Sequence, residues 1–250
     1  IPPVRVSEKE VVAPGQRLIA SLEQTILYED DAIMAVDKPS GLAVHGGSGL
    51  SYGLIEALRV MRPKAKLLEL VHRLDRDTSG CILIAKKRSM LRYLHDQMRR
   101  GGIHKSYQLL VCGEVKQKSF VADAPLKKNT IKSGERMVCV DSEGKPSLTR
   151  FRRIATGNGF SHLEARLETG RTHQIRVHCC WLGHPIAGDE KYGDRAVNQQ
   201  LQSNGLKRLF LHASKLIVPF DGVSDCLTIE SDLPHELKQV LKGLEKHEIL

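Results

Sequence analysis

Two short polar clusters contain the residues whose types could do chemistry. The first is VHRLDRDTSG, residues 71–80, where Arg73, Asp75, Arg76 and Asp77 stand between the apolar segments LLEL and CILIAKK. Charged side chains are seldom buried without partners, so this cluster is either an exposed loop or a site. A carboxylate beside guanidinium groups stays ionised, because the positive charge lowers its pKa. Such a carboxylate can act as a nucleophile, as a base or as the stabiliser of a sugar cation.

The residue types of this first cluster do not identify the reactive carboxylate. If the segment is extended, Arg73, Asp75 and Asp77 share one face, and Leu74 and Arg76 share the other. Asp75 and Asp77 are then equally good candidates. A loop held by local salt bridges, each contributing little to stability, is about as compatible with the composition as a site.

The second cluster is ETGRTHQIRVH, residues 168–178. It places Arg171, His173, Arg176 and His178 around a predicted helix start. A helix N-terminus with a nearby arginine can bind phosphate, because its free N–H groups and the guanidinium both attract anions. A solvated basic face is the alternative, and it is less favoured because the apolar segment WLGHPIAG follows at once.

Other polar features of the sequence are weaker signals. Tyr107 stands alone among aliphatic residues in KSYQLLVCG and is by default a core tyrosine with its hydroxyl at the edge. The glycine-rich HGGSG, which begins at His45, could bind phosphate through its N–H groups, but a flexible turn is favoured. Cys179 and Cys180 in HCCWLGH do not predict a zinc site, because adjacent cysteines rarely both reach one tetrahedral metal.

The clusters must be positioned by a fold in which strands outnumber helices. Predicted strands are TILYED, AIMAVDK, LLELVH, CILIAKK, KSYQLLVCG, LTRFRRIA, SHLEARLET, RLFLHASKLIVP and CLTIES. Predicted helices cover residues 54–61, run from a cap at Ser89 to about Arg100, follow Gly170, and cover LPHELKQVLKGL. Residues 127–144 are expected to form a hairpin or a long loop. Frequent hairpin links favour an α+β fold with a mixed, mostly antiparallel sheet, flanked by helices and loops.

The composition of the chain favours a polyanionic partner. The 250 residues carry a formal net charge of +9, and aromatic residues make up only 4%, so bases have few surfaces on which to stack. Six cysteines at irregular spacing indicate free thiols in a reducing cytoplasm. The sequence contains no apolar run long enough for a membrane span and no recognisable signal peptide. Residues 1–20, with two adjacent prolines and no sustained periodicity, are expected to be a linker or tail.

Four segments, in order and at similar spacing, resemble the RluA-type pseudouridine synthases. They are KPSGLAVHGG, HRLDRDTSG, the tyrosine of KSYQLLV, and GRTHQIRVH with GHPIAGD. The resemblance runs from about Thr25 to the C-terminus and is strongest to members that act on large-subunit ribosomal RNA. It implies a pseudouridine synthase fold with a central RNA-binding cleft. Residues 21–250 would then be the catalytic domain, and residues 1–20 the tail of an N-terminal S4-type RNA-binding domain.

The function implied by the resemblance is the isomerisation of specific uridines to pseudouridine in 23S (large-subunit) ribosomal RNA. It implies no cofactor and no metal, a cytoplasmic monomer, and no membrane or protein partner. Three alternatives stay open: the same chemistry on transfer RNA, a non-catalytic RNA-binding or ribosome assembly module, and an N-glycosidase that releases free base.

The resemblance also implies roles for individual residues. Asp75 would be the catalytic carboxylate, which either attacks the sugar C1′ or abstracts a sugar proton. Tyr107 would stack on the flipped uridine and act as acid or base, and Arg73 would fill the gap left in the RNA stack. Arg176 would pair with Asp75 and keep it ionised, while Arg171 would meet phosphate, with the reverse assignment open. Further RNA-binding residues would be His72, Arg76, Thr78, Arg171, His173, Lys38 and His45.

Overall fold

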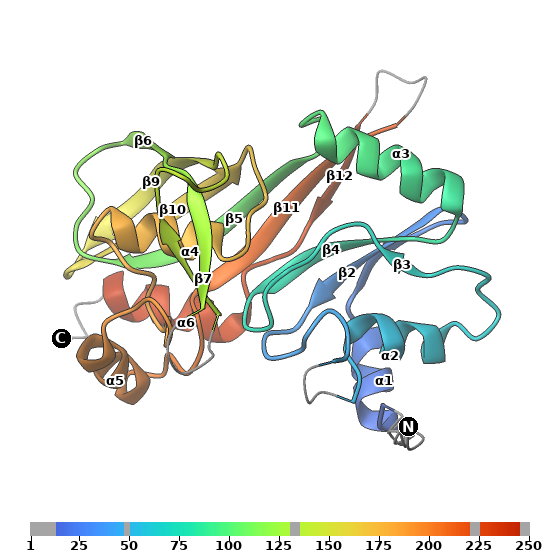
Figure 1. The fold of residues 1–250 in the computed structure, drawn as a ribbon. Helices are drawn as coiled ribbons and strands as arrows, with labels where there is room; N and C mark the ends of the chain where they lie inside the picture. Colours follow the sequence, from blue (N-terminus) through green and yellow to red (C-terminus); the bar gives the residue numbers. More distant parts are fainter. Residues whose placement is uncertain (1–13, 48–50, 131–135, 221–225, 246–250) are drawn as a thin grey trace, which may run out of the picture.

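The computed structural model describes residues 14–47, 51–130, 136–220 and 226–245 (Figure 1). The strands are β1 (Ile26–Glu29), β2 (Ile33–Lys38), β3 (Glu69–Leu70), β4 (Ser79–Ala85), β5 (His104–Cys112), β6 (Ser119–Asp123), β7 (Leu126–Thr130), β8 (Arg136–Val140), β9 (Leu148–Gly157), β10 (Phe160–Leu167), β11 (Leu211–Pro219) and β12 (Cys226–Glu230). The helices are α1 (Gln16–Glu23), α2 (Leu54–Met61), α3 (Arg88–Arg99), α4 (Gln174–Trp181), α5 (Arg195–Ser203) and α6 (His235–Glu245).

One large sheet organises the molecule. Its strand order is β1-β2-β4-β11-β5-β10-β9-β6, with β3 added to β4 and β12 added to β11. Within the described residues, the ladders of this sheet are antiparallel except the one that joins β4 to β11. A separate hairpin is formed by β7 and β8. The expected α+β fold with a mixed, mostly antiparallel sheet is confirmed, as is the hairpin within residues 127–144.

Strand β4 is buried on both faces because helices cover the sheet from two sides. Ile82 on β4 packs into a cluster with residues of α1 and α2, whereas its neighbour Leu83 packs into a second cluster that contains Leu94 of α3. Figure 1 shows α3 on one side of β2 and β4 and the pair α1 and α2 on the other. A strand covered on both faces reads as a continuous apolar run, which explains why CILIA lacks alternation.

The parallel contact between β4 and β11 brings the first polar cluster to the centre of the sheet. Gly80 pairs with Ala213, and Ala213 in turn pairs with Tyr107 of β5. Gly80 has φ +108°, and a Cβ there would collide with the backbone of Ala213. A residue with a side chain therefore cannot replace this glycine without moving β4 away from β11. One strand, β11, thus separates β4 and the loop before it from Tyr107 on β5.

Some elements differ from those predicted. Helix α1 begins at Gln16, inside the segment expected to be a linker, and buries Leu22 against the core; residues 1–13 lie outside the described residues. Helix α3 begins at Arg88, so Ser89 lies in its first turn and is not its cap. Strand β6 and helix α5 were not predicted. The cap of α5 is Asp194, whose carboxylate accepts two backbone N–H bonds.

Candidate active site

The loop of residues 71–78 is a turn and not an extended segment. The backbone N–H of Thr78 donates to the carbonyl of Asp75 at 3.2 Å, which closes a turn over Arg76 and Asp77. Arg76 Nε donates to Asp77 Oδ1 at 3.0 Å, and both side chains are largely exposed. The prediction that Arg73, Asp75 and Asp77 share one face is therefore wrong, because the turn breaks the alternation of a strand.

Two side chains, the buried Lys38 and the half-buried His72, hold this loop in place. Lys38 Nζ donates to the carbonyls of Pro39, Leu42 and Arg76 at 3.0, 2.8 and 2.9 Å, which uses all its hydrogens. His72 Nε2 accepts the N–H of Leu83 on β4 at 3.2 Å. The Lys38 contact joins the loop to the end of β2, and the His72 contact joins it to β4.

Lys38 and His72 were both predicted to bind RNA, and the structure gives both of them contacts within the protein. Lys38 is fully buried. Its three hydrogens are taken by carbonyls, so it positions the loop, while its contact with RNA stays a prediction. Burial lowers the pKa of Lys38 to about 7, with the charge of Asp77 opposing that shift. Burial and the charge of Lys105 lower the pKa of His72 to about 3, which keeps its imidazole neutral and able to accept the bond from β4.

The second cluster forms the first turn of α4, as predicted. His173 adopts the left-handed conformation, with φ 53° and ψ 21°, immediately before the helix. Gln174 Oε1 accepts the backbone N–H of Arg171 at 2.9 Å, and its Nε2 donates to the carbonyl of Leu148 on β9 at 3.0 Å. The helix start is therefore fastened to the sheet. Two residues further along, Arg176 points into the molecule and is only 7% exposed.

Arg176 joins the two clusters by its bond to Asp75, and it also binds the carboxylate of Asp189. Its Nη1 donates to Asp75 Oδ2 at 3.2 Å, and its Nε and Nη2 donate to the two oxygens of Asp189, each at 2.8 Å. Burial disfavours the charged form of Arg176, but the two carboxylates outweigh that cost, so its pKa is raised. The geometry selects Arg176 over Arg171 as the partner of Asp75. Arg171 is exposed, and its Nε donates to the carbonyl of Pro146 at 3.2 Å.

Asp189 and Tyr192 were not assigned a role from the sequence. Asp189 is fully buried in its side chain and accepts the backbone N–H groups of Lys191 and Tyr192 at 2.9 and 3.0 Å. Burial would raise the pKa of Asp189, but the bonds from Arg176 and from the backbone lower it overall. The aspartate that ends GHPIAGD, directly after a run of small and apolar residues, was a signal that could have identified it.

Tyr192 links the β7–β8 hairpin to the start of α4. Its hydroxyl lies 2.8 Å from His173 Nδ1 and accepts the backbone N–H of Val138 at 3.1 Å. Its ring lies 5.1 Å from the guanidinium carbon of Arg176. His173 Nε2, in turn, is 3.8 Å from Asp75 Oδ2, while burial lowers the pKa of His173. The hairpin, the helix start and Asp75 are therefore connected by side-chain contacts.

Asp75 lies where two cavities meet. A cavity of about 520 Å³ brings together all but one of the residues predicted for the site. They are His45, His72, Arg73, Asp75, Arg76, Thr78, Tyr107, Arg171, His173 and Arg176. Thr78 is buried in its wall, whereas His45 and Arg73 are exposed. A second cavity of about 1400 Å³ shares Asp75, Arg76, His173 and Arg176 with the first.

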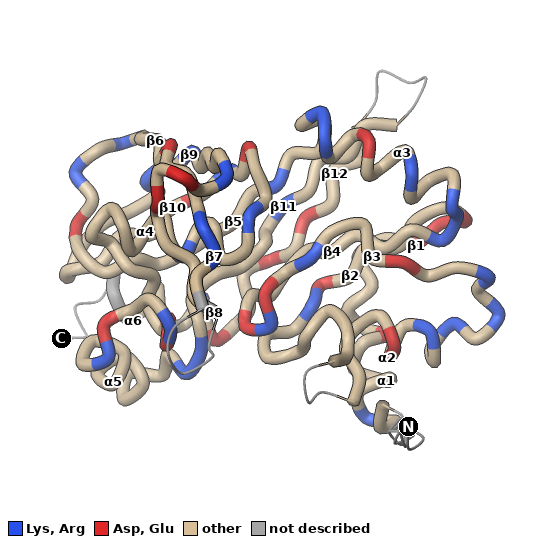
Figure 2. The backbone as a smooth tube through the Cα atoms, viewed as in Figure 1, with Lys and Arg blue, Asp and Glu red and all other residues tan. Residues whose placement is uncertain are grey.

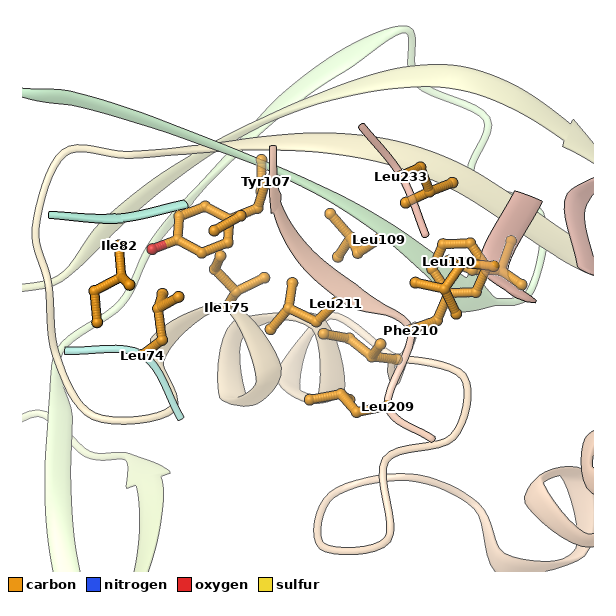
Figure 3. Packing of buried hydrophobic residues seen from close by; sticks show 14 of the residues in the cluster. Leu74, Ile82, Tyr107, Leu109, Leu110, Ile175, Leu209, Phe210, Leu211 and Leu233 are labelled. Carbon is orange, nitrogen blue, oxygen red and sulfur yellow. The ribbon is translucent and has the colours of Figure 1, made fainter. Parts of the chain in front are cut away.

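Tyr107 is buried where the sheet borders the first cavity. Figure 3 shows its hydroxyl at the end of an apolar cluster, on the side of Leu74 and Ile82, with Ile175 beneath the ring. Among the described residues the hydroxyl makes no hydrogen bond to protein. Burial and the charge of Asp75 raise the pKa of Tyr107, which keeps the phenol neutral. The ring is thus available for stacking and the hydroxyl for a bond to a bound molecule.

Metal binding and membrane insertion find no support in the part of the chain that the structure describes. No group of three or more histidine, cysteine or acidic side chains there is arranged to hold a metal ion. Cys179 is buried and Cys180 exposed, so the two adjacent thiols lie in different environments. No helix in the described ranges is long and apolar enough to cross a membrane.

Comparisons with known proteins agree on one family. Residues 32–181 match the family model described as RNA pseudouridylate synthase. The chain is 53% identical over 249 residues to ribosomal large subunit pseudouridine synthase C of Salmonella typhi, which covers 98% of this chain and 78% of that protein. The protein of the same name from Escherichia coli (strain K12) is 52% identical with the same coverage.

Solved structures share the fold. Human RNA pseudouridylate synthase domain containing 4 has a TM-score of 0.76 at 24% identity, covering 92% of this chain and 96% of its own. Human RNA pseudouridylate synthase domain containing 1 has a TM-score of 0.71 at 24% identity, covering 94% of this chain and 98% of its own.

Proposed function

Because the chain belongs to the family of RNA pseudouridylate synthases and is therefore an isomerase that acts on RNA, we propose that it converts specific uridines of large-subunit ribosomal RNA to pseudouridine. The choice of ribosomal RNA is supported by the names of the bacterial relatives, which share 50–53% of their residues with this chain. Transfer RNA is the alternative substrate of the same chemistry.

The observation that carries the mechanism is the position of Asp75. Its carboxylate lies at the junction of two cavities, about one quarter exposed, with the Arg176 guanidinium 3.2 Å away. A carboxylate that is reachable from solvent and held by a fixed cation can be aimed at a sugar in the cavity. Asp77, by contrast, pairs with its neighbour Arg76 at the surface and does not line the smaller cavity. Asp75 is therefore the proposed catalytic residue.

The isomerisation needs only bond changes within the uridine. The bond from N1 to the sugar C1′ breaks, a bond from C5 to C1′ forms, the C5 proton leaves, and N1 ends with one proton. Atoms and electrons balance without an oxidant or a reductant. In one course Asp75 attacks C1′ and is later displaced by C5. In the other it removes a sugar proton, and both courses place the same carboxylate beside the sugar.

A base in a folded RNA must leave its stack before it can enter the cavity, which costs a few kcal/mol. We propose that Arg73, exposed at the rim, occupies the gap and offsets part of that cost by stacking its planar guanidinium. Tyr107 would lie against the flipped uracil. Its neutral phenol can stack and donate a hydrogen bond, and to accept a proton from C5 it would first have to lose its own.

The test is tritium release from RNA that carries tritium at C5 of uridine, with large-subunit ribosomal RNA and transfer RNA assayed separately. Release from ribosomal RNA alone is expected, and Asp75→Asn should abolish it while RNA affinity stays within a few fold. Release from transfer RNA alone would overturn the substrate assignment. Activity that survives in Asp75→Asn would overturn the catalytic assignment.

Two readouts exclude the remaining alternatives. Mass spectrometry of the digested RNA should show an unchanged mass, because isomerisation adds and removes nothing. Free uracil in the product would indicate an N-glycosidase instead. Tight RNA binding without tritium release by the wild-type chain would indicate a binding or assembly role.

A further inference from the structure

Helix α3 presents one exposed stripe of basic side chains, which we call the α3 ridge: Arg88, Arg92, His95 and Arg99. All four are exposed, and their spacing of four, three and four residues places them on one face of the helix. At 1.5 Å per residue the stripe is about 16 Å long. Figure 2 shows lysine and arginine recurring along α3.

Two arginines of the ridge have no protein partner among the described residues. Arg88 and Arg92 form no ion pair or hydrogen bond there, and Arg99 shares the single carboxylate of Asp96 with Arg100. Like charges four residues apart on a helix repel each other and destabilise it. The ridge therefore holds positive charge that the described part of the protein leaves largely uncompensated.

The exposed arginines on β9 are arranged differently. On β9, Arg150 Nε donates to Glu168 and Arg152 Nε donates to Glu164, each at 2.9 Å. These ion pairs link β9 to β10 and to the residue that follows it, and each glutamate neutralises its arginine locally. The ridge differs from β9 in that Arg88 and Arg92 form no ion pair in the described structure.

The opposite face of α3 is committed to the core. Leu94 is buried, and Met90, Leu91 and Tyr93 pack against the cluster that includes β2 and β4. The Tyr93 hydroxyl donates to the carbonyl of Pro219 at 3.0 Å. A membrane-surface helix would need that apolar face for insertion. Only the charged face of α3 is available to a partner, because the packing of its apolar face fixes the helix against the sheet.

The C-terminal end of α3, where the ridge ends at Arg99, borders the proposed active site through Met98. Met98, in the last turn of α3, lines the smaller cavity together with Arg73 and Lys105. Lys105 Nζ lies 3.8 Å from Met98 Sδ, which joins α3 to the start of β5. A polyanion that leaves this cavity on the side of Met98 meets Arg99 first and can continue along Arg92 and Arg88.

We propose that the α3 ridge binds the phosphates of the RNA strand that flanks the target uridine. This inference rests on the proposed function, because it takes the smaller cavity as the uridine site. A chain with only 4% aromatic residues has few rings for stacking bases, so contacts to phosphate are the interaction that this helix can offer. The ridge would orient the RNA without reading its sequence.

The test compares two double variants of the full chain that remove the same charge. Arg88→Ala/Arg92→Ala alters the ridge, and Arg150→Ala/Arg152→Ala alters the paired arginines on β9. The dissociation constant of transcribed large-subunit ribosomal RNA is measured over a range of salt concentrations. Each lost phosphate contact should lower the slope of log affinity against log salt by about 0.7 to 0.9. The ridge variant should therefore lose about 1.4 to 1.8 of slope and, relative to 1 M salt, roughly 25- to 60-fold of affinity at 0.1 M salt.

The β9 variant should keep its slope within a few tenths and its rate of tritium release. Equal slopes for the two variants would overturn the proposal. So would an unchanged RNA slope combined with ridge-dependent binding to phosphatidylserine vesicles, which would assign the ridge to a membrane surface. A wild-type chain that binds RNA through the ridge but releases no tritium would refute the proposed function and leave the ridge standing.

Discussion

Replacing Asp189 by asparagine tests whether a buried carboxylate positions the catalytic one. Asparagine has nearly the same shape and can still accept the N–H groups of Lys191 and Tyr192. It loses the charge that compensates Arg176, whose side chain is only 8% exposed. The substitution therefore leaves a buried guanidinium with Asp75 as its remaining acidic hydrogen-bond partner among the described residues.

The expected cost follows from burial. Removing one member of a buried ion pair costs about 3 to 5 kcal/mol of unfolding free energy, because the other charge stays buried and loses its closest counter-charge. In a chain of 250 residues each kcal/mol shifts the melting temperature by about 2 to 4 °C, so the melting temperature should fall by roughly 6 to 20 °C. Asp75→Asn replaces a carboxylate that is 26% exposed and that makes a single 3.2 Å bond, to Arg176, so it should cost about 1 kcal/mol.

The assay pairs urea unfolding with tritium release for both variants. Asp75→Asn should lose turnover with little loss of stability, whereas Asp189→Asn should lose stability and retain a reduced, measurable turnover. The pKa of Asp189 is lowered in the folded chain, so its stabilising contribution is present above about pH 4 and is lost as the pH falls through the folded value. The stability difference between wild type and Asp189→Asn should therefore shrink only in acid.

Two results would refute this reasoning. One is an Asp189→Asn chain that unfolds within 1 kcal/mol of the wild type (well below the roughly 3 kcal/mol expected). The other is an Asp75→Asn chain that is the less stable of the two variants. Either result would mean that Arg176 does not depend on Asp189 for its compensation.

Three further predictions concern single substitutions. Tyr107→Phe should lose tritium release, while Tyr93→Phe, which removes a hydroxyl that borders neither cavity, should keep it; equal losses would make Tyr107 merely structural. Tyr192→Phe leaves the N–H of Val138 without its acceptor and should cost about 1 to 3 kcal/mol in urea unfolding. It should also lower kcat more than it raises KM, and an unchanged kcat would contradict its positioning role. Gly80→Ala should prevent stable folding, because its Cβ would collide with the backbone of β11; a normal circular dichroism melt would contradict this.

Local patterns were sufficient to predict most of the elements. The helix over residues 54–61 was predicted with the bounds that the structure has, because its apolar residues recur at helical spacing. Helix α5 was missed because RAVNQQLQS has only two apolar side chains larger than alanine, and its main signal is the cap at Asp194. Strand β6 was missed because its sequence, SFVAD, is short and only one of its residues is buried.

The motifs of the first cluster located the site but could not describe its geometry. Asp75 and Asp77 have the same chemistry two residues apart, and the turn between them sends one toward α4 and the other toward Arg76. Lys38 was expected at the RNA surface because it begins a motif, yet the three carbonyls around it bury it completely.

The sequence by itself determined the α+β architecture, the preference for a polyanion and the family, since apolar periodicity, net charge and short motifs are local properties of the chain. Only the tertiary structure decided that Arg176 and not Arg171 holds Asp75, and that Asp189 fixes that arginine. Arg176 and Asp75 are 101 residues apart in the chain, and their meeting depends on how β4, β11 and α4 are packed. The spacing of two residues along a sequence does not predict the distance between them in space, because that distance is set by the burial of side chains from every element between the two residues.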